Sequence, residues 1–470
     1  MLRRSHRSSR LFAARGRRWP LGALAVALAL VAPLGLSAQE APAATIETQR
    51  TQASERFGRL FDAVVATTAR AFWDKELLAS IGWEARAAEA RAGVATAPTL
   101  EAAAGRINAL LAELKTSHTV LLTPDDTDYY ILLDVFSGSS NGREIVAERF
   151  PGGVVSFAGI GVFTARIDGR HFVDAVLEGS PAERAGILAG DEMVGVDGAE
   201  YHPIRSFRGK VGEEAAVTLR RSAGGPLEVI EVRVVAIAPL RAFSAATEAS
   251  ARTFARDGRR IGYVRVWASV GERSATALAN AFSSLGLVRR AEGDRRAPGA
   301  RQPPPLLDGL VIDMRGKIGG TANNASRYLE LIDPRGPLIR SRNPARERIG
   351  RSVRGRTAVL VDHRTRSTAE LFVHAYKRER QGPLIGTRTA GAVSAGHAFA
   401  MPGGNLLYLA VTGLEVDGEV VEGAGVAPDI EVARPLPYAR GADPVLEAGI
   451  EALARGPAPG ARANGAVRAP

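Results

Sequence analysis

The part of the chain beyond Arg241 alternates between short runs typical of strands and longer stretches whose apolar residues recur at helical spacing. In order, the segments are RIGYVRVW, SATALANAFSSLGL, LLDGLVIDM, ANNASRYLELI, TAVLVD, STAELFVHAYKRE and PLIGT. Parallel neighbouring strands need a long connection, usually a helix, so the alternation predicts an α/β domain with a mixed or parallel sheet. We assign this domain to residues 241–440.

Two regions with different periodicities precede it. Residues 45–137 are rich in Ala, Glu, Leu and Arg at helical spacing, which predicts an N-terminal helical domain. Residues 154–238 contain short β-branched runs separated by turns and one helical segment, SPAERAGI, which predicts a compact barrel-like β module. Between them, SGSSNGREIVAERFPGG is interpreted as a mobile loop, and the Pro/Gly/Ala-rich residues 456–470 as a disordered tail. The predicted fold class is therefore an α+β multidomain chain.

The N-terminus has the pattern of a signal peptide. A basic stretch is followed by the apolar run Leu21–Leu36 and then by small residues in SAQEAPA, so residues 1–38 are predicted to direct export. The apolar run is short for a membrane span and contains Pro33. An uncleaved membrane anchor is the alternative, and Arg17-Arg18 loosely fits a twin-arginine signal. We expect a periplasmic or secreted protein, with no stable membrane span once the leader is removed.

The composition excludes several classes of function. The formal charge of +11 includes seven arginines within the first 18 residues, and 11 − 7 leaves only +4 for the rest, too little to indicate a nucleic-acid partner. The chain has no cysteine, which excludes disulfides, thiol catalysis and thiolate metal sites. Because no group of His and carboxylate residues has metal-ligand spacing either, we expect no cofactor.

Two loops carry residues suited to catalysis. RTRSTAELFVHAY follows the strand-like TAVLVD, which would place Ser367 at a helix N-terminus as a nucleophile. The alternative is that Ser367 only caps the helix through its side-chain oxygen. DMRGKIGG follows another apolar run, so its backbone N–H groups could hold an oxyanion, or the loop could be a purely structural turn.

The joint order of GYVRVW, DGLVIDMRGKIGG, VLVDHRTRSTAE, LIGTRTAG and VVEGAGVAPDIEV resembles the S41-type C-terminal processing (tail-specific) and tricorn-core-like serine peptidases, which are hydrolases. The resemblance implies a PDZ domain at residues 154–238 and an α/β catalytic core of the crotonase-like type. It also implies that GIGV, formed by Gly159, Ile160, Gly161 and Val162, binds a peptide carboxylate. Ser367, three residues before Glu370, matches the nucleophile, and the N–H groups of Gly320 and Thr368 match the oxyanion hole.

The general base departs from the bacterial pattern. Processing peptidases of that type have a lysine 25 residues after the serine, where this chain has Ala392. The tricorn-type branch instead uses a Ser-His pair before the core and a glutamate before a GV-x-PD motif, which match Ser117-His118 and Glu422.

Other interpretations of these residues stay open. Ser117 could be a cap or turn residue, and Glu422 a surface acid. His397 could line the cleft, whereas Lys317 and Lys377, the lysines nearest the site in sequence, are expected to be solvated.

The hypothesis from the sequence is an exported serine peptidase. Its PDZ domain would capture a protein or peptide substrate by the free C-terminus, and Ser367 would cleave it by acyl transfer, with activity rising with pH through the histidine range. One alternative is a catalytically inactive PDZ-containing scaffold that only binds peptides. Another is a Ser-Lys peptidase with a displaced lysine. The sequence leaves the substrate and the oligomeric state open.

Overall fold

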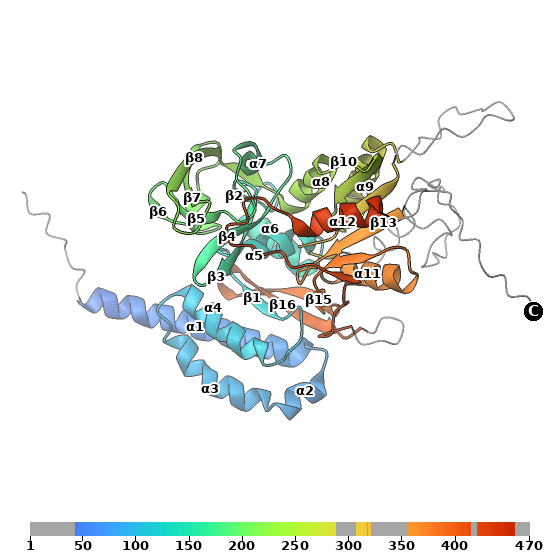
Figure 1. Cartoon of the computed structure of the whole chain (residues 1–470). Helices are drawn as coiled ribbons and strands as arrows, with labels where there is room; N and C mark the ends of the chain where they lie inside the picture. Colours follow the sequence, from blue (N-terminus) through green and yellow to red (C-terminus); the bar gives the residue numbers. More distant parts are fainter. Residues whose placement is uncertain (1–42, 288–306, 317, 321–355, 415–420, 456–470) are drawn as a thin grey trace, which may run out of the picture. The chain divides into compact units, whose positions relative to one another are not determined.

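A computed structural model describes residues 43–287, 307–316, 318–320, 356–414 and 421–455 (Figure 1). The predicted leader, the predicted tail, the segment ANNASRYLELI and Lys317 lie outside these residues. The chain divides into two units, residues 1–49 and Arg50–Pro470. Of the first unit, only the start of helix α1 (Ala43–Ala71) is described, and every other element below belongs to the second.

The α/β part is built on a six-stranded sheet in the order β10-β11-β12-β13-β14-β17. The first pair is antiparallel and every other neighbouring pair is parallel, which confirms the predicted mixed sheet. The strands span Arg252–Arg256 (β10), Arg259–Arg265 (β11), Gly309–Asp313 (β12), Arg356–Val361 (β13), Leu384–Gly386 (β14) and Ile430–Glu431 (β17).

Helices cover both faces of this sheet. Alternate residues of a strand point to opposite faces, so one set of apolar side chains, including Val264 and Ile312, packs with α9 (Gly271–Ser284) and α11 (Thr368–Arg378). The other set packs with α12 (Pro444–Ala454). Burial on both faces explains why these strands read as nearly continuous apolar runs.

The β module, residues 157–237, forms a separate sheet in the order β3-β4-β5-β7-β8, with β6 paired to β5. Its first and last strands, β2 and β9, pair with each other. Ile160, Val173, Phe207, Val217 and Val232 belong to its own apolar core. The elements are β2 (Phe157–Gly159), β3 (Val162–Ile167), β4 (Arg170–Val176), α7 (Pro181–Arg184), β5 (Glu192–Val196), β6 (Ala199–Glu200), η1 (Arg205–Phe207), β7 (Glu214–Arg220), β8 (Leu227–Arg233) and β9 (Val235–Ile237).

The N-terminal helices share a core with a hairpin from near the other end of the chain. Strand β1 (Val120–Leu122) pairs with β16 (Asn405–Thr412), which in turn pairs with β15 (Ala395–Met401). Apolar side chains of α1, α3 and α4 pack against this three-stranded sheet. The remaining helices are α2 (Lys75–Ser80), α3 (Trp83–Ala95), α4 (Leu100–Ala112), α5 (Thr127–Val135), α6 (Ser140–Arg149) and α8 (Pro239–Ala249), with a short turn η2 (Pro402–Gly404).

The interpretation of residues 137–153 as a loop was wrong. They contain helix α6, whose first turn is capped by Ser139, because its Oγ accepts from the Gly142 amide at 3.0 Å. Ile145 and Val146 anchor the helix in the apolar cluster that includes α5. Two buried apolar residues among polar neighbours give too weak a periodicity to be recognised in the sequence.

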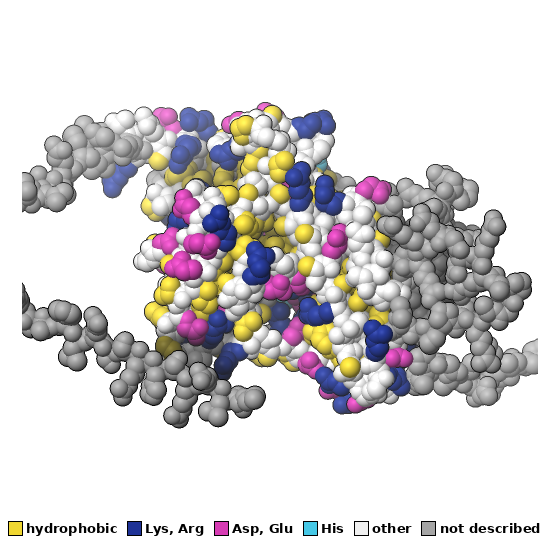
Figure 2. Space-filling model, turned by 90° about the horizontal axis from the view of Figure 1, so that it is seen from above, with side chains coloured by type: hydrophobic (Ala, Val, Ile, Leu, Met, Phe, Trp, Pro, Cys, Tyr) yellow, Lys and Arg dark blue, Asp and Glu magenta, His cyan; other side chains and the backbone are white. Residues whose placement is uncertain are grey.

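Charged side chains are mixed over the surface. Figure 2 shows Lys and Arg side chains interspersed with Asp and Glu on the face it presents. Among the described residues, no helix is long and apolar enough to cross a membrane. Within the same ranges, no group of three or more His, Asp or Glu residues is arranged to hold a metal ion.

Candidate active site

Ser367 lies between β13 and α11, where the chain turns from the sheet into a helix. It occupies the N-cap position with φ 57° and ψ −128°, but its side chain makes no capping hydrogen bond. Its amide donates to the Ala392 carbonyl at 2.7 Å. A positive φ is costly for a residue with a Cβ and persists where surrounding contacts impose it, often at functional sites. The simple capping interpretation is therefore wrong: the backbone of Ser367 is held by Ala392, and its hydroxyl is not used by the helix.

The glycine loop after β12 lies against this serine. A Cβ on Gly319 would come within 2.6 Å of Ser367 Cβ and 2.9 Å of Ser367 Oγ. A Cβ on Gly320 would come within 1.9 Å of the Ser269 carbonyl oxygen, and the Ser269 amide donates to the Gly319 carbonyl at 3.0 Å. A side chain would therefore collide with neighbouring atoms at either position, which requires glycine at both. Because the Gly319 position lies against Ser367, the loop lines the space around the Ser367 hydroxyl.

The structure places both predicted oxyanion donors beside the serine. Thr368 is the first residue of α11, and Gly320 follows Gly319 in the glycine loop. Within the described part of the chain, no acceptor receives a hydrogen bond from either amide. The N-terminus of a helix also carries partial positive charge, which favours an anion at this position.

Glu370 holds the loop that fixes Ser367, a role that the sequence did not reveal. It is fully buried on α11, and its carboxylate accepts from Thr389 Oγ1 at 2.5 Å, from the Gly391 amide at 2.7 Å and from the Ala392 amide at 2.6 Å. Burial raises the pKa of Glu370, and these hydrogen bonds offset only part of the rise. The sequence signal that could have indicated this role was the position of Glu370, an acidic residue, on the apolar face of the predicted helix.

Ser117 lies in contact with both His118 and Glu422 in the structure. Ser117 Oγ lies 2.6 Å from His118 Nδ1, and the Ser117 amide donates to Glu422 Oε1 at 2.8 Å. Glu422 Oε2 accepts from the amides of Val393 and Ser394, each at 2.9 Å. Because Val393 follows Ala392, the same loop contacts both Glu422 and Ser367.

The carboxylate of Glu422 is kept ionised by this arrangement. Burial alone would raise the pKa of Glu422, but the hydrogen bonds from Ser117 and from the amides of Ser394 and Val393 outweigh it, so the pKa is lowered. Glu422 is thus not the free surface acid of the alternative interpretation. It joins the N-terminal segment that carries Ser117-His118 to the loop beside Ser367.

His118 is buried and neutral. Only 4% of the residue is exposed, and its ring lies 5.1 Å from the ring of Tyr408. Burial lowers the pKa of His118 to about 4, helped by the positive charge of Arg366 and opposed by Glu422. Arg366 directly precedes Ser367, so the imidazole lies within electrostatic reach of the nucleophile loop. Ser367 and His118 form no direct hydrogen bond.

Residues 301–432 match the sequence model of Peptidase family S41. Over these residues the chain is similar to that peptidase family. The Carboxy-terminal processing protease CtpA of Bacillus subtilis (strain 168) is 27% identical over 301 residues, which cover 60% of this chain and 58% of that protein. This chain therefore spans less than two thirds of the length of that relative. The carboxy-terminal processing proteases of family S41 are serine peptidases.

Two solved structures are also similar to this chain. The photosystem II D1 C-terminal processing protease has a TM-score of 0.47 and 20% identity, with coverage of 85% of this chain and 96% of that one. The tricorn protease has a TM-score of 0.46 and 19% identity, with coverage of 85% of this chain and 37% of that one.

The structure also locates the other candidate bases. His397 on β15 packs 4.9 Å from the Phe399 ring, and its Nε2 lies 3.4 Å from Asn141 Nδ2. Lys377 is not simply solvated, because its Nζ donates to the Ala427 carbonyl at 2.7 Å and pairs with Asp429 at 3.2 Å. Ala392 is buried with 3% exposed. Neither His397 nor Lys377 joins the network that links Ser117, Glu422 and the loop beside Ser367. Ala392 belongs to that loop through its backbone, but its side chain has no basic group.

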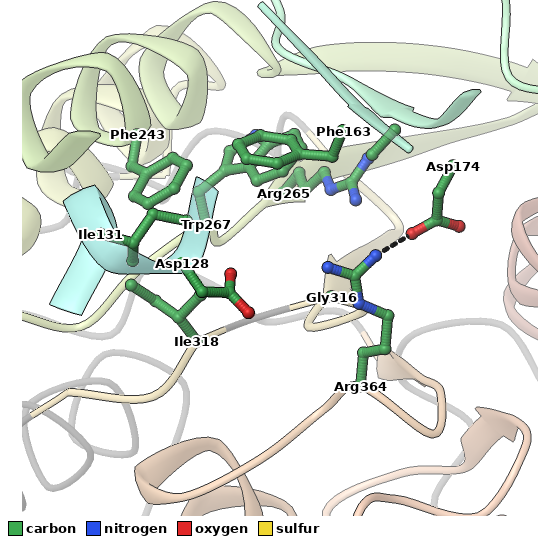
Figure 3. A pocket seen from close by; sticks show the side chains of 11 residues that line it. Asp128, Ile131, Phe163, Asp174, Phe243, Arg265, Trp267, Gly316, Ile318 and Arg364 are labelled. Carbon is green, nitrogen blue, oxygen red and sulfur yellow. Dashed lines mark hydrogen bonds and ion pairs between the residues drawn. The ribbon is translucent and has the colours of Figure 1, made fainter. Parts of the chain in front are cut away.

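A small aromatic pocket of about 20 Å³ lies beside the glycine loop and the nucleophile loop (Figure 3). Phe163, Phe243 and Trp267 form one wall, with the rings of Phe243 and Trp267 parallel at 5.9 Å. The ion pair between Asp174 and Arg364 closes one end. Ile318 and Arg364 lie within three residues of Gly320 and Ser367 respectively, so the pocket lies beside the candidate catalytic residues.

The Gly159–Val162 segment connects β2 to β3 in a tight turn. Gly161 has φ 93°, and a Cβ there would come within 2.3 Å of Ser180 Cβ. The carbonyls of Ile160 and Gly161 accept from the amides of Ala182 and Leu177 at 3.0 Å and 2.9 Å. Their own amides donate to no carbonyl in the described ranges. The turn therefore offers two backbone donors at the start of strand β3.

Proposed function

We propose that this chain is an exported serine peptidase of family S41 that cleaves protein or peptide substrates by acyl transfer through Ser367. The observation that carries the proposal is the placement of Ser367 at a helix N-terminus, with a positive φ and no capping hydrogen bond. Gly319 lies directly against its hydroxyl, and the loop at Ala392 and Val393 joins it to Glu422 and Ser117-His118. These features suit a nucleophile and not a helix cap.

In the proposed reaction, His118 Nε2 accepts the proton of Ser367 Oγ as this oxygen attacks the substrate carbonyl carbon. The tautomer that can do so carries its proton on Nδ1, which then donates to Ser117 Oγ 2.6 Å away. Glu422, held by the Ser117 amide, favours the imidazolium that forms. The same proton passes to the leaving amine, and water later releases the acyl group by the reverse path.

The oxyanion of the tetrahedral intermediate would bind the amides of Gly320 and Thr368. Preorganised backbone donors of this kind are worth about 10²–10³ each in rate, because they stabilise charge that develops only in the transition state. Closing the gap between His118 and Ser367 is the remaining requirement, and catalytic hydrogen bonds often shorten only when substrate is bound.

A covalent serine probe tests this proposal. A fluorophosphonate should label the full chain at Ser367, as peptide mapping by mass spectrometry would show, and should not label Ser367→Ala. If the folded protein is not labelled and hydrolyses no peptide or activated ester, the chain is a peptide-binding scaffold. The absence of a Ser367–His118 hydrogen bond is the observation that favours this second candidate.

The low pKa of His118 predicts an unusual pH profile. The base works only when unprotonated, so kcat/KM should rise as pH increases through about 4 and should stay level through neutrality. A histidine with the ordinary pKa of 6.5 would instead place the midpoint in the neutral range. Steady-state rates with a neutral peptide, corrected for acid unfolding by circular dichroism, provide the measurement. A midpoint near 6.5 would contradict the buried state of His118.

The β module is proposed to act as a PDZ domain that captures a free C-terminus. No carbonyl in the described part of the chain accepts from the amides of Ile160 and Gly161, which suits a carboxylate ligand. Among the described strands β3 lies at the sheet edge, so an extended peptide could add to it. Peptides with a free carboxylate should bind at least tenfold more tightly than the same peptides amidated, since charged hydrogen bonds are among the strong ones. Fluorescence anisotropy measures this, and equal affinities would contradict carboxylate capture.

Export is the part of the proposal that rests on the basic–apolar–small leader. The mature protein should be found outside the cytoplasm with an N-terminus near Gln39. Cell fractionation and N-terminal sequencing test this, and a full-length cytoplasmic product would refute it.

A further inference from the structure

A second pocket, of about 420 Å³, lies between the end of β3 and the segment before Ser367. Residues 165–167 line one side, and residues 361–364 line the other. It shares Asp174 and Arg364 with the aromatic pocket, whose wall includes Phe163. The two pockets therefore follow one another along β3, on the side where the nucleophile loop approaches.

Strand β3 determines in which order a bound peptide would pass the two pockets. No described strand pairs with its outer edge, because β3 ends the sheet order. A peptide captured by its carboxylate at Ile160 and Gly161 would run antiparallel to β3 and advance by about 3.3 Å per residue. Its last residue would lie beside Val162, so about the fourth to sixth residues from its end would reach residues 165–167 and the larger pocket.

Three arginines place positive charge in the larger pocket. Arg364 and Arg434 both bind the single carboxylate of Asp174. Arg166 also lines the pocket, is exposed, and has no hydrogen bond or ion pair with any residue in the described ranges. One guanidinium group is therefore available to a ligand, beside two others that share one counter-charge.

The other charged groups of the pocket are already engaged. Arg315 is held between Asp313 and Asp443, each at 2.7 Å, and neither of these acids lines the pocket. Asp362 accepts from the amides of Gly316 and Arg364, each at 3.0 Å. The charge of Arg315 is balanced by its own two aspartates. The remaining charged residues of the pocket are three arginines and two aspartates, so the pocket has a net positive charge.

We propose that this basic pocket binds an acidic side chain of the substrate, located at about the fourth to sixth residue from the carboxyl terminus. The inference rests on the proposed capture of that terminus by the Gly159–Val162 turn. Substrates would then be proteins whose C-terminal segment carries an Asp or Glu between the captured end and the scissile bond. Arg166 is the residue that selects it.

The experiment measures binding to the full-length Ser367→Ala protein, so that cleavage does not interfere. A labelled free-carboxylate peptide with apolar and neutral residues carries one Glu, moved in turn through the last eight positions and compared with Gln at each. Glu should bind about two- to fivefold more tightly than Gln at the fourth to sixth positions only, which is the range for partly exposed ion pairs. Raising the salt concentration should reduce this preference.

Two variants locate the effect. Arg166→Gln should remove the preference for Glu, whereas Arg233→Gln should keep it. Arg233 is a matched control, because it lies on β8 at the opposite edge of the same sheet and pairs only loosely with Glu214 at 3.6 Å.

The outcomes separate this inference from the function on which it rests. Equal binding of Glu and Gln peptides at every position would overturn the inference and leave carboxylate capture intact. A preference for Glu that survives Arg166→Gln, or that appears only at the last two positions, would overturn it as well. Failure of every free-carboxylate peptide to bind would overturn the proposed capture, and the inference with it.

Discussion

Replacing Ser367 or His118 with alanine should each lower kcat by a factor on the order of 10⁴ or more, and the double replacement should cost little beyond either one. Residues that act as a unit are strongly non-additive, because once the base is lost the nucleophile contributes almost nothing. Ala392 cannot replace the base, and the structure brings no lysine into the Ser117–Glu422 network within the described ranges. Steady-state hydrolysis of a peptide that the natural chain cleaves measures all three variants.

The controls for this prediction are lysines. Lys377→Ala should keep most turnover, because Lys377 is engaged with Ala427 and Asp429 and not with the serine. Lys317→Ala is expected to behave in the same way. Near-normal turnover in His118→Ala, or a collapse in either lysine variant, would revive the displaced-lysine alternative.

Gly319→Ala should lower kcat by about 10²–10³ while the protein stays folded. The new methyl group would sit 2.9 Å from Ser367 Oγ, so either the hydroxyl or the glycine loop must move. A displacement of about 1 Å at a reacting atom is enough for a loss of about 10². The positive φ of 94° adds backbone strain, which lowers the thermal midpoint as well as the rate.

The control variant Gly198→Ala separates the effect of backbone strain from the effect of a steric clash with the nucleophile. Gly198 also has a positive φ, 79°, but a Cβ there would meet nothing within 4 Å. Both alanine variants should lose about 1–2 kcal/mol of stability through backbone strain. Gly319→Ala should lose more, because its new methyl group also meets Ser367, and only Gly319→Ala should lose turnover. Differential scanning fluorimetry and peptide hydrolysis provide the two measurements. Equal turnover in the two variants would show that Gly319 does not crowd the nucleophile.

The α/β sheet could be predicted from the sequence because its strands are buried on both faces. Runs such as the one preceding Asp313 are apolar throughout, and the helix after Ser367 has a clear apolar face. The position of Ser367 followed from the same local pattern. Whether its hydroxyl caps the helix could not be predicted, because that depends on a backbone angle imposed by Ala392 and the glycine loop.

The candidate base required long-range information. Nothing in the local sequence around Ser117 and His118 indicates that the Ser117 amide donates to Glu422, 305 residues later, and only the resemblance to known peptidases connected them. The low pKa of His118 arises from burial and from Arg366, and the function of Glu370 depends on a loop 19 to 22 residues further along. Both properties depend on contacts between residues that are distant in the sequence, so they cannot be predicted from local sequence patterns.

Under the proposed mechanism, the pairing of β1 with β16 would determine when the chain can become active. A nascent chain that has been synthesised only as far as Ser367 has the nucleophile but lacks β16 and Glu422, which arrive some fifty residues later. Until then His118 has no strand partner to hold its segment in place and no carboxylate to orient Ser117. Incomplete chains, including truncated translation products, would therefore be harmless to the proteins around them.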